Sequence, residues 1–201
     1  FEEEGAHVEQ IDIGIERPQQ ELSDLWCRLI APRNIATLEA VKESGGVDLL
    51  GDHHQDFPAE YLRWIGIGQH LSAVEFYKDQ EIRTEIYDAI QSVLSKYDLL
   101  ITPTLACLPV DNSNNGNTVG PTEINGETVD PLIGWCLTYL LNFTGHPAAS
   151  IPAGLSENGL PVGMQIIGRR YADADVLAAS AAFERLRPWH ESYQKCKERA
   201  L

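Results

Sequence analysis

Two apolar runs near the C-terminal end of the chain flank a short polar segment. The runs AASIPAGL (148–155) and LPVGMQIIG (160–168) stand on either side of Ser156 to Gly159. This segment ends in Asn158 and Gly159, and an Asn-Gly pair supplies the positive φ angles that a tight hairpin turn needs. The pattern therefore predicts a strand, a turn and a strand.

A helical period follows the predicted hairpin. Asp173 is the expected N-cap, and Asp175 lies in the first turn, where the helix dipole favours a negative charge. Pro188 ends the run. Apolar residues recur at helical spacing between these points, at Val176, Ala179, Phe183 and Leu186. A helix laid on a sheet is the expected result.

The N-terminal third changes its period once. Residues 5–15 alternate apolar and polar positions, which predicts a strand. From Pro18 the apolar residues fall on one helical face, with an interruption expected at Pro32 and a stop at Gly45 and Gly46. Trp26 lies on this apolar stripe, which favours the core over a pocket wall.

The middle of the chain predicts a helix, a strand and a long loop. Residues 82–97 carry apolar side chains at spacings of three and four, which is typical of a helix that covers a sheet. Residues 99–101 are all apolar, which indicates a strand buried on both faces, ended by Thr102 to Thr104. Residues 109–131 are rich in Asn, Gly and Thr, and a second Asn-Gly pair at Asn125 allows a small hairpin.

Residues 132–141 are nearly all apolar and contain Trp135 and Tyr139. Buried aromatic side chains beside a turn of small residues are what an apolar substrate pocket needs. Packing in the core explains the same two residues equally well. His146, between Gly145 and Pro147, is interpreted as a structural turn residue.

Composition and charge exclude several functions. The 201 residues carry a net charge of −15, which repels phosphate backbones and anionic membranes, so we expect no nucleic-acid and no membrane partner. The four cysteines are far apart, and unpaired thiols favour a cytoplasmic protein. His53 and His54, near Asp52 and Asp56, suggest a metal site, but neighbouring residues diverge too much for one ion, so a solvated turn is favoured.

Several motifs together resemble the amidase signature family. The block N-x-x-G-x-P-A-x-S-x-P-x-G from Asn142 is followed by GLPVGMQIIGRR, and YDLLITPTLACLPV stands upstream. The resemblance runs over essentially the whole chain. It implies an α/β fold, a mixed sheet covered by helices on both faces, with residues 1–201 forming the C-terminal part of a single amidase domain and no separate second domain.

The resemblance also implies what this chain lacks. Family members hydrolyse amides with a serine nucleophile, a second serine on a cis peptide bond and a lysine, all in an N-terminal Gly/Ser-rich segment that does not occur here. We therefore assign no catalytic residue to this chain. The triad is expected on an N-terminal chain of the same enzyme, in a tight heterodimer or in a longer protein from which this chain is a fragment. No metal and no organic cofactor is implied.

Four residues are the candidates for contact with a small amide or lactam substrate: Trp135, Tyr139, Met164 and Ile167. Some family members have an aspartate near the position of Trp135, so an indole there would favour an apolar substrate. The alternatives are a non-catalytic binding or scaffold domain derived from an amidase, the A subunit of a tRNA-dependent amidotransferase and, third, a metal hydrolase using His53 and His54. A homo-oligomer is possible in each case.

Overall fold

The computed structural model describes residues 1–113 and 118–190 of the chain. They fall into two compact units, which are described one at a time. Unit 1 combines residues 1–15, 86–109 and the part from 140 onward, and unit 2 combines residues 16–85 and 110–139. Cys196 lies outside the described residues. Among the described helices, none has the length and apolarity needed to span a bilayer.

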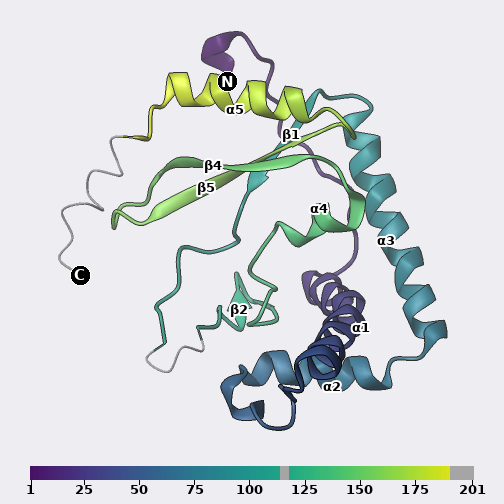
Figure 1. The fold of residues 1–201 in the computed structure, drawn as a ribbon. Helices are drawn as coiled ribbons and strands as arrows, with labels where there is room; N and C mark the ends of the chain where they lie inside the picture. The colour runs from purple at the N-terminus through teal and green to yellow at the C-terminus, as the bar shows by residue number, and fades with distance from the viewer. Residues whose placement is uncertain (114–117, 191–201) are drawn as a thin grey trace. The chain divides into compact units, whose positions relative to one another are not determined.

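A three-stranded sheet forms the centre of unit 1 (Figure 1). Its strands are β1 (Leu99–Pro103), β4 (Ala148–Leu155) and β5 (Pro161–Gly168), in the order β1-β5-β4. Both pairings are antiparallel. The hairpin predicted from the two apolar runs is therefore present as β4 and β5, and the later apolar run of the two occupies the middle of the sheet.

The hairpin turn differs in detail from the prediction. Gly159 has a φ of +75°, whereas Asn158 is not among the residues with positive φ, so the expected pair of left-handed residues is wrong. The Gly159 amide donates to the Ser156 carbonyl at 2.9 Å, and the Ser156 amide donates to the Leu160 carbonyl at 2.8 Å. A longer loop with one left-handed glycine closes the hairpin, because this geometry needs only one residue without a Cβ.

Helix α5 (Asp173–Leu186) covers one face of β4 and β5, as Figure 1 shows. The predicted helix is confirmed, and Val176 is buried on its inner side. A Cβ added to Gly168 would lie 2.6 Å from a methyl carbon of Val176, so this glycine lets the helix approach the sheet closely. Asp173 is not the N-cap as predicted. Ala172 takes that position, because its carbonyl accepts the first helical hydrogen bond, from the Val176 amide at 3.3 Å.

Strand β1 is less buried than the sequence predicts. Leu100 is 6% exposed, but Ile101 on the opposite face is 39% exposed, so burial on both faces is wrong for the described residues. The reason is position: β1 is at the edge of the three-stranded sheet, and α5 packs on β4 and β5.

The predicted strand in residues 5–15 is also wrong. A short 3-10 helix (Glu2–Glu4) is followed by a segment with no strand pairing among the described residues, and most of its side chains are exposed. Gly14 has a φ of +80°, and its amide donates to the Asp12 carboxylate at 2.8 Å. Alternation alone does not make a strand, since a strand also needs backbone hydrogen bonds to a neighbouring strand, and no described strand pairs with this segment.

Helix α3 (Ala73–Leu94) begins in unit 2 and contributes its last turns to unit 1. The predicted helix is confirmed and starts earlier than its apolar pattern. Its unit 1 part is held by buried side chains at spacings of three and four, at Ile86, Ile90, Val93 and Leu94. The short helix α4 (Tyr139–Thr144) leads into β4.

Unit 2 is built on α1 (Gln19–Gly45) and α2 (Ala59–His70), which pack on each other. A Cβ on Gly68 would lie 2.6 Å from the Cβ of Ala31, which shows how closely the two helices approach. The expected interruption at Pro32 is wrong: α1 continues through it. One lost backbone hydrogen bond is tolerated here because the adjacent Ala31 is buried against α2. The predicted stop is confirmed, since Gly46 adopts a left-handed C-cap.

A second hairpin, which lies in unit 2, confirms the small hairpin predicted at Asn125 and Gly126. Strands β2 (Glu123–Ile124) and β3 (Glu127–Thr128) pair antiparallel. Asn125 and Gly126 between them have φ angles of +52° and +84°. Both turn residues are left-handed, as a two-residue turn of this kind requires.

Candidate functional site

A fixed turn from Val129 to Cys136 presents Trp135 in unit 2. The Asp130 carboxylate, on a residue that is 3% exposed, accepts the Leu132 amide at 2.9 Å and pairs with the Arg63 guanidinium. The Gly134 amide donates to the Asp130 carbonyl at 2.7 Å, and a Cβ on Gly134 would lie 2.5 Å from the Asp130 nitrogen. The turn therefore depends on a buried carboxylate at one end and a glycine at the other.

The indole of Trp135 is held in one orientation. Its Nε1 donates to the Pro131 carbonyl at 3.1 Å, and the Gly120 amide donates to the same oxygen at 2.8 Å. The ring lies against Gly120, where a Cβ would come within 2.2 Å of Nε1. Trp135 is half-buried. A rigid, partly exposed aromatic side chain is suited to forming an apolar wall.

Tyr139 lies deeper than Trp135. It is 1% exposed, its hydroxyl accepts a hydrogen bond from the Gln19 amide at 2.7 Å, and its ring stacks on Trp26 with centroids 6.4 Å apart. Burial raises the pKa of its hydroxyl. These contacts favour the core-packing alternative for Tyr139 and for Trp26.

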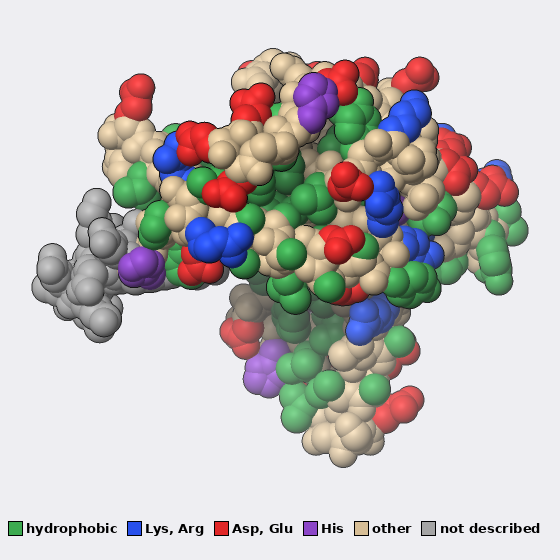
Figure 2. Space-filling model, turned by 90° about the horizontal axis from the view of Figure 1, so that it is seen from above, with side chains coloured by type: hydrophobic (Ala, Val, Ile, Leu, Met, Phe, Trp, Pro, Cys, Tyr) green, Lys and Arg blue, Asp and Glu red, His purple; other side chains and the backbone are tan. Residues whose placement is uncertain are grey.

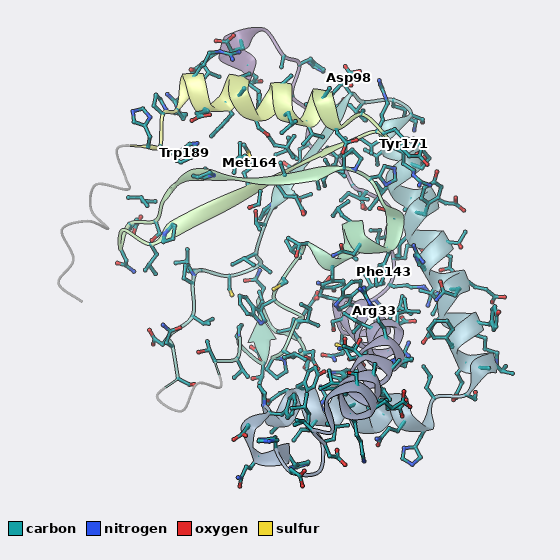
Figure 3. All side chains as sticks on the ribbon, viewed as in Figure 1. Arg33, Asp98, Phe143, Met164, Tyr171 and Trp189 are labelled. Carbon is teal, nitrogen blue, oxygen red and sulfur yellow. The ribbon has the colours of Figure 1, made fainter. Side chains whose placement is uncertain are left out.

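Met164 and Ile167 project from opposite faces of β5 in unit 1. Met164 pairs with Pro103, on the face where Gly168 meets α5 (Figure 3). Ile167 pairs with Leu100 and Ala148 on the other face and is 1% exposed. The structure therefore does not bring these two candidates together, because residues three apart on a strand point to opposite sides.

Sequence reasoning missed a polar row on the Ile167 face. Gln165 pairs with Thr102 on one side and Ser150 on the other, and its side-chain amide donates to the Thr102 hydroxyl at 3.0 Å. Thr104 and Ser150 share a hydrogen bond of 2.7 Å across Gly163, whose missing side chain leaves the room for it. The available signal was Gly163 and Gln165, which interrupt the apolar run at alternate positions.

The interpretation of His146 as a structural residue is confirmed. It is 5% exposed, its ring stacks on Tyr87 at 5.5 Å, and its Nε2 lies 3.2 Å from the Gln91 side-chain oxygen. The other ring nitrogen, Nδ1, is buried and has no hydrogen-bond partner among the described residues. Burial lowers the pKa of His146, and the nearby Arg170 lowers it further. A buried neutral imidazole is the result.

The ionisable groups of the described residues offer no metal centre. Within residues 1–113 and 118–190, no group of three or more His, Cys, Asp or Glu is placed to hold an ion. His53 instead lies 3.1 Å from Asp56 at the surface. Lys42, Lys78 and Lys96 are exposed, and Lys42 pairs with Asp48 at 2.5 Å.

Acidic side chains are spread over one face of the molecule. Figure 2 looks onto the face that carries α5 and shows acidic groups across it, with basic groups between them. This distribution agrees with the net charge of −15 and with the argument against a nucleic-acid partner.

Comparison with known proteins gives consistent matches. A family model described as Amidase matches residues 2–177. Among curated proteins, the chain is 29% identical to an acylamidase of Rhodococcus erythropolis, over 94% of this chain and 37% of that protein. It is 32% identical to the A subunit of the glutamyl-tRNA(Gln) amidotransferase of Thermodesulfovibrio yellowstonii, over 80% of this chain and 34% of that protein.

Solved structures agree with these matches. A bacterial aryl acylamidase of the amidase signature family has a TM-score of 0.94 and 51% identity, covering 100% of this chain and 41% of that one. The predicted combination of helices and sheet is thereby confirmed. A 6-aminohexanoate cyclic dimer hydrolase has the same fold, with a TM-score of 0.60 and 23% identity. The chain spans only part of the length of these relatives: 34% of the amidotransferase subunit, 37% of the acylamidase and 41% of the aryl acylamidase.

Proposed function

Because this chain belongs to the amidase signature family, we propose that it is the C-terminal part of an enzyme that hydrolyses carboxylic amides with an apolar acyl or aryl group. The observation that carries the proposal is the likeness to the bacterial aryl acylamidase, at 51% identity over the whole of this chain. Both units are proposed to belong to one amidase domain. A cytoplasmic location is part of the same proposal.

The proposed mechanism uses a serine acyl-enzyme formed by a Ser–cis-Ser–Lys triad that this chain does not carry. The described lysines support this view. Lys42, Lys78 and Lys96 are all exposed, whereas a catalytic lysine base is expected to be buried. The part of the enzyme that supplies the triad is the proposed partner, either as a separate N-terminal chain or as the rest of a longer protein. This chain would contribute structure and a wall of the substrate pocket.

The proposed substrate preference follows from Trp135. An indole held against Gly120 offers an apolar surface and carries no hydrogen-bond acceptor for a charged amine, since its Nε1 is a donor only. An anilide or another aryl amide fits that surface, and a lactam of similar polarity is a further candidate substrate. The match to the A subunit of an amidotransferase keeps glutamine hydrolysis as the second candidate.

The test uses the whole enzyme, including the part that carries the triad. We expect hydrolysis of acetanilide and 4-nitroacetanilide, loss of activity after treatment with a fluorophosphonate, and no loss after treatment with a chelator. Activity that survives the fluorophosphonate would contradict the serine mechanism. Activity on glutamine with none on either anilide would favour the amidotransferase alternative, and no amide hydrolysis at all would favour a scaffold domain.

A further inference from the structure

We propose that Gly120 is a positioning residue for Trp135, and that this contact determines which amides the pocket accepts. The inference rests on the proposed function, because it takes the Trp135 indole as part of the pocket wall. Gly120 itself need not touch the substrate. It acts through the ring that lies against it.

The geometry shows a close contact. A Cβ on Gly120 would lie 2.1 Å from Cδ1 and 2.2 Å from Nε1 of the indole, so no side chain fits while the ring keeps its place. The contact is completed by the Pro131 carbonyl, which accepts both the Gly120 amide and the indole Nε1. The Pro131 carbonyl oxygen thus fixes the backbone at Gly120 and the Trp135 ring relative to each other.

The backbone does not explain the glycine. Gly120 is not among the residues with positive φ, and it precedes Pro121, a position that favours extended conformations open to any residue. The backbone conformation therefore admits an alanine at Gly120. The three atoms that would lie nearest to an added Cβ all belong to the Trp135 ring, so the indole is the first obstacle to a side chain here.

A methyl group at this position must move the ring. The indole Nε1 donates to the Pro131 carbonyl at 3.1 Å, so we expect a displaced ring to lose this hydrogen bond as well. Changes of one methylene in a hydrophobic pocket alter substrate discrimination by about 10- to 200-fold. Gly120→Ala should therefore change selectivity among amides that differ in size near the ring.

The experiment measures kcat and KM of the whole enzyme for acetanilide, butyranilide and octananilide. Gly120→Ala is expected to change the ratio of kcat/KM between the short and the long anilide by about tenfold. Gly45→Ala is the matched control, because its Cβ would meet no described atom within 4 Å and its φ is not positive. It should leave the ratio unchanged.

A double variant separates positioning from general damage. If Gly120 acts through the indole, Trp135→Ala and Gly120→Ala/Trp135→Ala should have the same anilide profile within about twofold, because alanine lacks the Cγ, Cδ1 and Nε1 atoms that clash with the added methyl group. Selective ¹⁵N labelling of tryptophan gives a second readout. The indole N–H resonance that disappears in Trp135→Ala should shift in Gly120→Ala and stay in place in Gly45→Ala.

Each outcome decides the proposal. An unshifted indole resonance in Gly120→Ala, or a full further change of profile when Gly120→Ala is added to Trp135→Ala, would overturn the positioning role. A shifted resonance with an unchanged anilide ratio would overturn the role in selectivity while leaving the contact. If the wild-type enzyme hydrolyses no anilide, the proposed function fails on its own, and the selectivity claim falls with it, whereas the resonance still reports on the contact.

Discussion

The Arg169 guanidinium donates from Nε to the carbonyl oxygen of Leu94, the last residue of α3, at 2.9 Å. The same side chain reaches the Tyr97 carbonyl at 3.2 Å and the Asp98 carboxylate at 2.9 Å. Figure 3 labels Asp98, which directly precedes β1. One arginine after β5 thus satisfies carbonyls at and just beyond the end of α3, where the last carbonyls have no partners within the helix.

Replacing Arg169 should destabilise unit 1. Arg169→Ala removes three hydrogen bonds, one to the last residue of α3 and two to the segment between α3 and β1, and we expect a loss of about 1–2 kcal/mol in the free energy of unfolding. Arg169→Lys should recover only part of it, because an ammonium group cannot reproduce the planar geometry. Urea unfolding of the whole protein measures both. Equal stabilities of Arg169→Ala and wild type would contradict the capping role.

The Gly163 position should not tolerate a side chain. A Cβ there would lie 2.8 Å from the Thr104 hydroxyl and 3.3 Å from that of Ser150. We expect Gly163→Ala to cost about 1–3 kcal/mol. Thr104→Ala in the same chain should recover part of the loss, since it removes the nearest atom. Gly66→Ala, where the added Cβ meets no described atom within 4 Å, is the control. A thermal midpoint that falls equally in both glycine variants would count against the prediction.

The Arg63–Asp130 pair should show strong coupling. Because the side chain of Asp130 is 2% exposed, Arg63→Ala leaves a buried carboxylate without its cation, at an expected cost of about 2 kcal/mol. Asp130→Asn in the Arg63→Ala background should cost less than it does alone. A double-mutant cycle by chemical denaturation measures this difference. Strictly additive effects would mean that the two side chains do not support each other.

His146 should make the protein less stable in mild acid. Burial and Arg170 lower its pKa below the ordinary value of 6.5, so the unfolded chain binds the proton more readily than the folded one. The stability contributed by the neutral ring is therefore fully present above pH 6.5 and is lost as the pH falls through the folded pKa. His146→Gln should flatten this fall in the unfolding free energy. Parallel curves for the two proteins from about pH 7 to about pH 5 would refute the assignment.

Cys27 should react only when the protein unfolds. It is 2% exposed, and burial raises its pKa from the ordinary value of 9.0 to about 12, which leaves on the order of a thousandfold less thiolate at a given pH. Iodoacetamide labelling followed by peptide mapping should find Cys107, which is half-buried, modified before Cys27. Both should label rapidly in concentrated guanidinium chloride. Early modification of Cys27 under native conditions would show that the site opens.

Local signals in the sequence determined much of this protein. Apolar periodicity located the main helices, and the Asn125-Gly126 pair located a hairpin, because both depend on interactions between residues close in the chain. Motif wording then identified the family, and no physical pattern in the chain alone would have done so. Trp135 was identified as a candidate from its place in the apolar residues 132–141.

Tertiary structure decided the rest, because burial and pairing depend on neighbours far away in the chain. Residues 5–15 alternate like a strand but have no partner strand among the described residues, and α1 continues through Pro32 because α2 packs against Ala31. The spacing of Met164 and Ile167 already placed them on opposite faces of a strand, but only the register of β5 showed which residues lie beside each of them. The approach of Gly120 to Trp135 joins two positions of irregular chain that are well separated in sequence, and no periodic pattern encodes a contact of that kind.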